Sequence, residues 1–131
     1  MTKTIQTKTI IELYNAVENF IQKDIELPVQ FSWDLETNSE TLKCIVEKFE
    51  RNRSKILTPL QEKNAFENLD NNQIKVKAPY VKDFEQAMKK INEYLTVENE
   101  IEIKTVKKED IPSSISVKDL RAIKFMISDT E

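Results

Sequence analysis

Histidine and glycine are absent from this chain of 131 residues, and cysteine occurs only once, as Cys44. Without histidine the chain lacks the commonest general base and metal ligand, and one cysteine cannot complete a zinc site of nitrogen and sulfur ligands. Catalysis by serine–histidine pairs, by cysteine–histidine pairs and by HExxH motifs is therefore excluded. Without glycine, the loops that close on phosphates in P-loop and Rossmann enzymes cannot form in their usual way. The sequence thus predicts a protein that is not an enzyme and has no catalytic residue, cofactor or metal.

Positive charge is not in excess, because 20 lysines and arginines stand against 23 acidic residues, for a net charge of −3. A nucleic-acid binder needs a basic footprint for the phosphates, so binding to DNA or RNA is not expected. No apolar run approaches the ~20 residues that cross a membrane, and the first residues lack the apolar core of a secretory signal. A lone cysteine cannot form an internal disulfide, which suits a reducing compartment. These features predict a cytoplasmic protein without membrane contact.

An amphipathic helix is expected near the N-terminus. Thr9 and Glu12 have the spacing of a capping box, in which each side chain bonds to the other residue's backbone. Apolar residues then recur at steps of three and four, which is typical of a helix with one buried face. They are Ile10, Leu13, Tyr14, Val17, Phe20 and Ile21. The helix is predicted from Thr9 to about Lys23, and Pro28 interrupts the chain after it.

A second, much longer helix is predicted from about Ser32 to Lys63. Its apolar residues recur every seven positions, at Leu35, Leu42, Phe49 and Ile56. At 1.5 Å per residue such a helix is roughly 48 Å long, so another element must pack along much of it. The apolar face of residues 81–95 predicts a helix that packs antiparallel to it. Pro59 is expected to end the long helix near Thr58 or to kink it there.

Two short segments have the patterns of strands. Residues 74–77 alternate apolar side chains with Lys75 and Lys77, as in an edge strand, and residues 100–106 alternate isoleucine with charge. We expect the two segments to form one small sheet. Asparagine must supply most of the positive φ angles that glycine usually supplies at turns. The expected positions are Asn68, Asn71 and Asn72.

The predicted fold class is α+β and mostly α. It contains a long antiparallel helix hairpin, N- and C-terminal helices and a small β element. The last helix is expected to begin at Ser116, where an approximate capping box reaches to Asp119. Residues 1–131 are expected to form a single domain, with a flexible or extended N-terminus over residues 1–8 and a frayed tail over residues 128–131.

Several short motifs occur in an order that resembles a known group of proteins. They are LPV (27–29), FERNR (49–53), EIEIKTV (100–106), DIP (110–112) and IKFMI (123–127). This order resembles small uncharacterised proteins of tailed phages and prophages of low-GC Gram-positive bacteria, which are classed as domains of unknown function. The resemblance covers roughly Glu12 to Ile127, and none of its motifs is catalytic. It implies a viral origin and a non-enzymatic role.

Phe31 and Trp33 are the aromatic candidates for a partner surface, because tryptophan is enriched in interface hot spots. The alternative interpretation is that both side chains fill the gap between the first two helices, which is the commoner role of such residues.

The basic candidates are Arg51 and Arg53 on the long helix, together with Lys75 and Lys77 on the edge strand. Glu47 and Glu50 are interleaved with the arginines, so ion pairs within the helix are the commoner explanation of that cluster. Glu100 and Glu102 lie on one face of a predicted strand and form a weaker candidate for a cation site. Ordinary exposed charge explains those two carboxylates better, and Cys44 is expected to be an inert thiol.

The leading hypothesis is a non-catalytic phage accessory protein that acts by protein–protein contact, in virion or tail assembly. Its partner would be a second copy of the chain or a larger phage or host protein. The protein would lie in the host-cell cytoplasm or associate with the virion. The alternative is a counter-defence or host-takeover protein that binds a host enzyme or sequesters a small nucleotide. The candidate binding residues for this role are Arg51, Arg53, Lys75 and Lys77.

Overall fold

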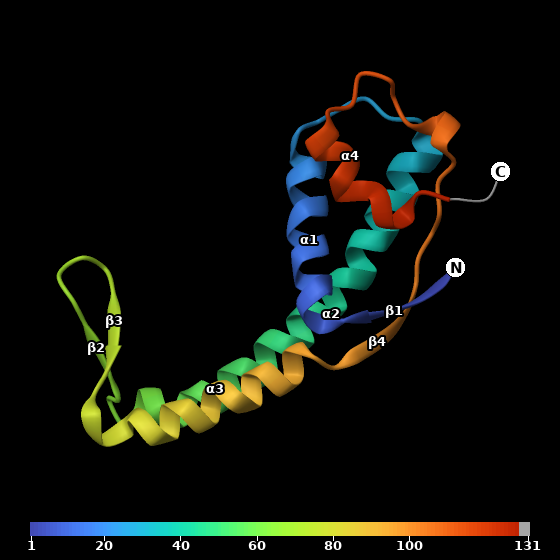
Figure 1. The fold of residues 1–131 in the computed structure, drawn as a ribbon. Coiled ribbons are helices and arrows are strands. Elements are labelled where there is room, and N and C mark those ends of the chain that lie inside the picture. The colour runs from blue at the N-terminus through green and yellow to red at the C-terminus, as the bar shows by residue number, and fades with distance from the viewer. Residues whose placement is uncertain (129–131) are drawn as a thin grey trace. The chain divides into compact units, whose positions relative to one another are not determined.

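The computed structural model describes residues 1–128, and the chain divides into two compact units. The first unit contains Met1–Val46 and the chain from Glu98 onward, and the second contains Glu47–Val97. Within the described residues there are four α-helices and two antiparallel sheets of two strands each (Figure 1). The α+β, mostly α class predicted from the sequence is therefore confirmed.

The first unit begins with a strand that leads directly into a helix. Strand β1 (Thr2–Gln6) pairs antiparallel with β4 (Glu98–Glu102), and helix α1 (Thr7–Gln22) follows without a loop. Of the two predicted alternatives, a flexible or an extended N-terminus, the structure shows the extended one, and this segment is paired in a sheet. The predicted start of the helix at Thr9 is wrong, because Gln6 is the N-cap. Asn99 donates to the Thr7 hydroxyl at 3.0 Å, which ties the start of α1 to β4.

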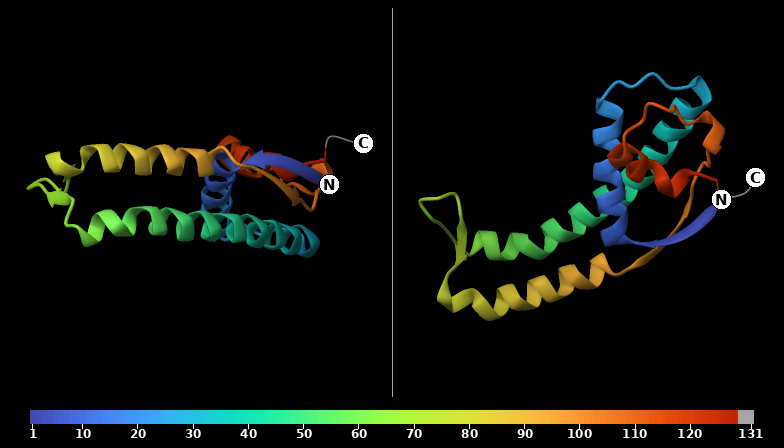
Figure 2. Two further views of the ribbon diagram at one scale, coloured as in Figure 1. Left: turned by 90° about the horizontal axis from the view of Figure 1, so that it is seen from below. Right: turned by 45° about the horizontal axis from the view of Figure 1, so that its top comes forward.

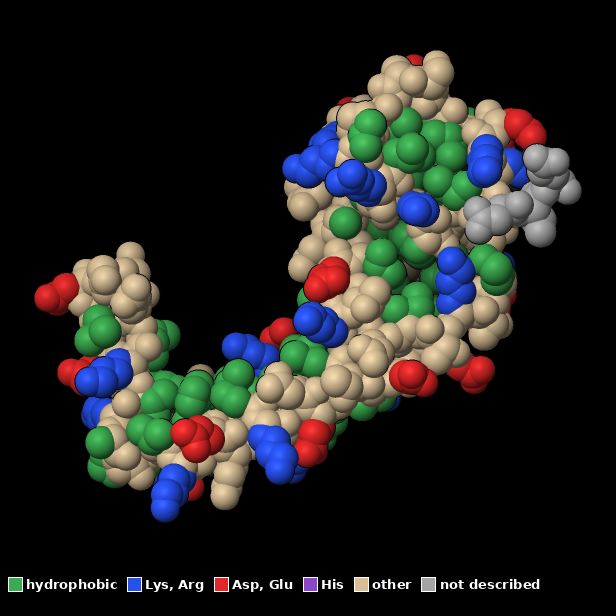
Figure 3. Space-filling model, in the orientation of Figure 1, with side chains coloured by type: hydrophobic (Ala, Val, Ile, Leu, Met, Phe, Trp, Pro, Cys, Tyr) green, Lys and Arg blue, Asp and Glu red, His purple; other side chains and the backbone are tan. Residues whose placement is uncertain are grey.

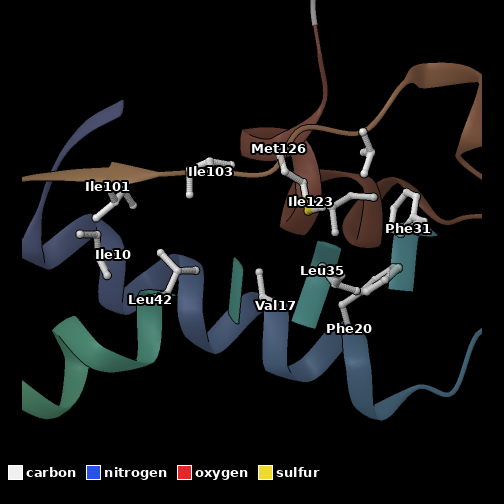
Figure 4. Packing of buried hydrophobic residues seen from close by; sticks show 11 residues of the cluster. Ile10, Val17, Phe20, Phe31, Leu35, Leu42, Ile101, Ile103, Ile123 and Met126 are labelled. Carbon is white, nitrogen blue, oxygen red and sulfur yellow. The ribbon is translucent and has the colours of Figure 1, made fainter. Parts of the chain in front are cut away.

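The core of the first unit is built from residues that lie far apart in the sequence. Its buried members are Ile10, Val17, Phe20, Phe31, Leu35, Leu42, Ile101, Ile103, Val106, Ile123 and Met126. Figure 4 shows these side chains pointing toward one another from α1, the first part of α2 (Val29–Glu62), the β4 segment, α4 (Val117–Ile123) and the turn η3 (Lys124–Met126). The seven-residue spacing of Leu35 and Leu42 therefore marks the buried face of α2, as predicted. Full burial of one such side chain stabilises the fold by roughly 1.5–3 kcal/mol.

The second unit is a helix hairpin with a small β-hairpin at its turn. The second part of α2 and helix α3 (Val81–Leu95) run antiparallel to each other (Figure 2), and the predicted bounds of α3 are confirmed. Between them, β2 (Phe66–Asn68) pairs with β3 (Ile74–Val76). The unit's own core consists of Leu60, Ala65 and Ala87, with Ile56, Leu57, Phe66, Tyr80 and Phe84 packed against them. Phe66 and Phe84 meet edge to face, with ring centroids 6.0 Å apart.

The predicted pairing of the two strand segments into one sheet is wrong. Strand β3 pairs with β2 in a local hairpin, and β4 pairs with β1 from the opposite end of the chain. The β1 sequence TKTIQ has little apolar alternation, so its strand signal is weak. Its partner β4 alternates as predicted, since Ile101 is buried and Glu100 and Glu102 are exposed. The predicted bounds of 100–106 are wrong, because the strand covers residues 98–102.

Helix α2 continues through Pro59 and ends at Glu62, which agrees with the predicted end at about Lys63 and not with the alternative end near Thr58. The predicted start at Ser32 is wrong, because the helix begins at Val29. Proline removes one backbone donor from the helix. The Leu60 and Gln61 carbonyls accept from Ala65 (3.0 Å) and Asn64 (3.1 Å), which is the pattern of a Schellman motif. The last turn is therefore held by its C-terminal cap.

Among residues 1–128, positive φ angles occur at Asp24 (54°), Asn64 (56°) and Asn72 (63°). Asn72 was predicted and is confirmed, whereas Asn68 and Asn71 do not have positive φ. Asp24 and Asn64 follow the ends of α1 and α2, where glycine is the usual residue. In the predicted tail, Ser128 donates to the Val106 carbonyl at 2.8 Å, and residues 129–131 lie outside the described part of the chain.

Candidate functional site

The C-terminal segment of the first unit closes into a loop around α4. Ile127 forms a parallel bridge with Val106, in which the Val106 amide donates to the Met126 carbonyl at 2.8 Å. Between these two residues the chain makes the short helical turn η2 (Lys108–Asp110), helix α4 and the turn η3 (Lys124–Met126). Ser116 is the N-cap of α4, as predicted, and its hydroxyl accepts from the Asp119 amide at 3.1 Å.

A cavity of about 680 Å³ lies within this segment, and we call it the α4 groove. Six apolar residues line it: Ile111, Pro112, Ile115, Val117, Leu120 and Ile127. The side chains of Val117 and Leu120 are 69% and 38% exposed, so the apolar floor is open to water. In Figure 3, hydrophobic side chains gather on this face of the first unit, with lysine and arginine side chains beside them. The α4 groove is thus an exposed apolar surface with a basic rim.

The basic rim consists of Lys108, Arg121 and Lys124. All three residues are exposed, and no carboxylate from residues 1–128 lines the groove with them. Glu109 and Asp110 follow Lys108 on η2 but do not line the groove, and Asp119 of α4 is buried and bonds to Lys23 of α1, with Nζ and Oδ1 2.5 Å apart. The hydrogen bond from Lys23 holds the pKa of Asp119 below its ordinary value. The positive charge of the rim is therefore concentrated on a chain whose net charge is −3.

A buried asparagine fixes the point at which the C-terminal segment leaves the sheet. The Asn38 side chain is fully buried on α2; its Nδ2 donates to the Lys104 carbonyl at 2.9 Å, and its Oδ1 accepts from the Lys104 amide at 2.8 Å. The same Nδ2 lies 3.6 Å from the sulfur of Met126. Asn38 was not among the predicted site residues. Its signal was its position, three residues after Leu35 and four before Leu42, on the buried face of the helix.

The two aromatic candidates have different surroundings. Phe31 is 2% exposed and belongs to the core, whereas Trp33 is 68% exposed. Val29 lies one helical turn before Trp33 and is 85% exposed. Residues four apart share a face of a helix, so these two side chains form an apolar surface, which we call the Val29–Trp33 face. The core-filling interpretation therefore holds for Phe31 and not for Trp33.

The four basic candidates lie in the second unit and do not line its described cavity. Arg51 and Arg53 are exposed on α2, while Lys75 is exposed on β3 and Lys77 follows it. Arg53 lies 3.7 Å from Glu50, which is one of the ion pairs within the helix that the sequence indicated. A cavity of about 490 Å³ between α2 and α3 is lined instead by Lys55, Lys63 and Lys90, with Asp83 beside them.

Glu102 of β4 bonds to groups at the N-terminus of the chain. Glu102 accepts from the terminal amine of Met1 and from the Thr2 hydroxyl, each at 2.7 Å, and the bond from the amine lowers the pKa of Glu102. Glu100 is exposed on the same strand. Over residues 1–128, no three acidic or cysteine side chains come together in a way that would hold a metal ion, and Cys44 is exposed.

Comparison with protein-family models, with curated proteins and with solved structures gives no match to this chain. No helix within residues 1–128 combines the length and the apolar character that a membrane span requires. The side chains themselves define three candidate functional surfaces, namely the Val29–Trp33 face, the α4 groove and the lysine-lined cavity of the second unit.

Proposed function

We propose that this is a non-catalytic phage accessory protein that acts by protein–protein contact, in the assembly of the virion or its tail. The observation that carries the proposal is the exposure of Trp33 beside Val29 on helix α2. A large aromatic side chain in water gains much by burial against a partner, and tryptophan is among the residues that dominate interface energies. The partner is a second copy of the chain or a larger phage protein.

Two further observations support this proposal. The order of motifs from LPV (27–29) to IKFMI (123–127) resembles small phage proteins, which supports a viral origin and a place in the host cytoplasm or on the virion. The absence of histidine and glycine supports a role without catalysis, because the usual catalytic and phosphate-binding arrangements need those residues.

The test compares the wild-type protein with Trp33→Ala and with Ile74→Ala. Ile74 is a matched control, since it is an exposed apolar residue in the second unit. Sedimentation velocity would measure self-association, and affinity purification from infected cells would identify bound virion proteins by mass spectrometry. We expect Trp33→Ala to lose the complex and Ile74→Ala to retain it. A wild-type protein that stays monomeric and captures no phage protein would refute the proposal.

A second candidate function is counter-defence by sequestering a nucleotide. The observation that favours it is the cavity of about 490 Å³ in the second unit, because Lys55, Lys63 and Lys90 line it and suit an anionic phosphate. Titration calorimetry with ATP and with a cyclic dinucleotide, on the wild type and on Lys55→Ala/Lys63→Ala, would measure this binding. Protection of the phage in a defence-carrying host would support this second function. Loss of virion production alone, on deletion of the gene, would support assembly.

A further inference from the structure

We propose that the α4 groove binds an acidic amphipathic peptide segment of a partner protein. The apolar side chains of the segment would lie on the floor of the groove, and its carboxylates would pair with Lys108, Arg121 and Lys124. This site is separate from the Val29–Trp33 face, because neither Val29 nor Trp33 lines the groove. The inference therefore stands independently of the assembly role.

The floor of the groove supplies the apolar side chains that would contact the ligand. Val117 at 69% exposure is the most exposed of the described hydrophobic residues of α4, and Leu120 lies one turn further on the same helix. Covering such side chains with apolar groups of a ligand removes them from water, which favours binding. Ile111 and Ile115 continue the apolar surface on the loop before α4. A ligand for this floor must present apolar groups along at least one turn of helix.

The positive charge of the rim indicates that the ligand is negatively charged. Lys108 comes from η2, Arg121 from α4 and Lys124 from η3, so the three cations surround the floor from different elements. Asp119 of α4 is turned to Lys23 of α1, and Glu109 and Asp110 follow Lys108 on η2 without lining the groove. Arginine and lysine at the edge of an apolar groove favour carboxylates on the incoming partner and disfavour basic segments. The expected ligand is therefore acidic as well as apolar.

The shape of the site favours a peptide over the other anionic ligands. Nucleic acid needs a longer basic stripe than three side chains and gains little from an apolar floor. A single lipid tail needs an enclosed site, and the exposure of Val117 leaves this one open. A concave apolar surface flanked by charge is the form in which proteins receive an amphipathic helix. The cavity of about 680 Å³ lies within the range of about 300–1,000 Å³ that is usual for ligand sites.

The experiment is a selection from a library of random 16-residue peptides displayed on the surface of yeast, with the full-length protein as the target. We expect the enriched peptides to combine apolar residues at helical spacing with at least two aspartates or glutamates. A fluorescent synthetic peptide of the enriched sequence is then measured by anisotropy. Its affinity should fall at least tenfold for Lys108→Glu/Lys124→Glu, and it should not change for the control Lys75→Glu or for Trp33→Ala.

A second measurement covers the case in which the double variant fails to fold. Amide chemical shifts of the labelled wild type, on addition of the peptide, should change mainly within residues 108–127. Enrichment of peptides without acidic residues, no enrichment at all, or shifts outside this segment would overturn the proposal. Vesicles of phosphatidylglycerol that bind wild type but not Lys108→Glu/Lys124→Glu, with no enriched peptide, would assign the groove to a membrane surface and overturn it as well.

Discussion

Asn38 pairs with the backbone of Lys104 through both atoms of its side-chain amide, at 2.9 and 2.8 Å. Lys104 lies just beyond the end of β4. The Asn38 side chain makes the two backbone hydrogen bonds with Lys104 that a neighbouring strand would make in a sheet. The pairing is buried, and Asn38 also contacts Met126 near the end of the segment that forms the α4 groove. This single side chain links the sheet, the long helix and the candidate binding site.

Replacement of Asn38 by alanine should strongly destabilise the protein. The change removes two hydrogen bonds and leaves the Lys104 amide and carbonyl without these partners, which should lower the free energy of unfolding by about 2–4 kcal/mol. The control is Asn52→Ala, because Asn52 lies on the same helix and its side chain donates only to the Lys48 carbonyl. Urea denaturation measures both variants. Equal effects at the two positions would contradict the role of Asn38.

The contact between Lys23 and Asp119 should make stability depend on pH. The lysine lowers the pKa of Asp119 from its ordinary value of 3.8, so the carboxylate stabilises the folded state above about that pH. This contribution should disappear as the pH falls through the lower pKa of the folded state. Asp119→Asn should therefore be less stable than the wild type at pH 5–7, and the difference should shrink below pH 3.8.

Denaturation in urea at several pH values measures this difference. Asp70→Asn is the matched control, since Asp70 is exposed in the turn between β2 and β3. That variant should show no comparable change in stability with pH. A difference between wild type and Asp119→Asn that stays constant from pH 7 to pH 2 would show that the contact with Lys23 is not electrostatic.

The two aromatic residues of α2 should respond differently to truncation. Phe31→Ala leaves a cavity in the core and should cost about 3–5 kcal/mol of unfolding free energy. Trp33→Ala removes an exposed side chain and should change stability by less than about 1 kcal/mol. The fluorescence of Trp33, the only tryptophan, should resemble that of tryptophan in water. A blue-shifted emission that moves to the red on unfolding would place the ring in a buried site instead.

The C-terminal cap of α2 shows how an asparagine takes the place that glycine usually has at the end of a helix. Asn64 has φ of 56° and stands at the position where helices most often carry glycine. Asn64→Gly should be as stable as the wild type or more stable, by up to about 1 kcal/mol, and Asn64→Ala should lose about 1 kcal/mol. Asn71→Ala is the control, since φ is not positive there. Thermal unfolding compares the variants, and a stable Asn64→Ala would contradict the cap.

Periodic patterns within one helix could be predicted from the sequence, because the same residues that create the pattern are the ones that are buried. The bounds of α3 and the burial of Leu35 and Leu42 are examples. Contacts between distant segments could not be predicted in this way. The pairing of β1 with β4 joins the two ends of the chain, and the strand signal in β1 is weak. The start of α1 was missed for the same reason, because Asn99 contributes to it from far along the sequence.

The same limit applies to the candidate sites. Burial of Phe31 and exposure of Trp33 follow from the face of α2 that meets the core, because Phe31 lies four residues before the buried Leu35 and Trp33 only two. The predicted start of the helix at Ser32 left Phe31 outside this spacing. Lys108, Arg121 and Lys124 meet around the α4 groove because the bridge between Val106 and Ile127 closes the segment. Their spacing in the sequence has no regular period. Arg51, Arg53, Lys75 and Lys77 were the more visible cluster, and they do not line the described cavity of their own unit.

The most direct test of a role in protein contact is site-specific photo-crosslinking in infected cells. A benzophenone amino acid would replace Trp33 in one protein and Ile74 in another, since both positions are exposed and only the first lies on the Val29–Trp33 face. We expect light to link the first protein to a second copy of the chain or to one identified virion protein, and the Ile74 control to give no such product. The same faint, unspecific products from both positions would contradict the proposed function.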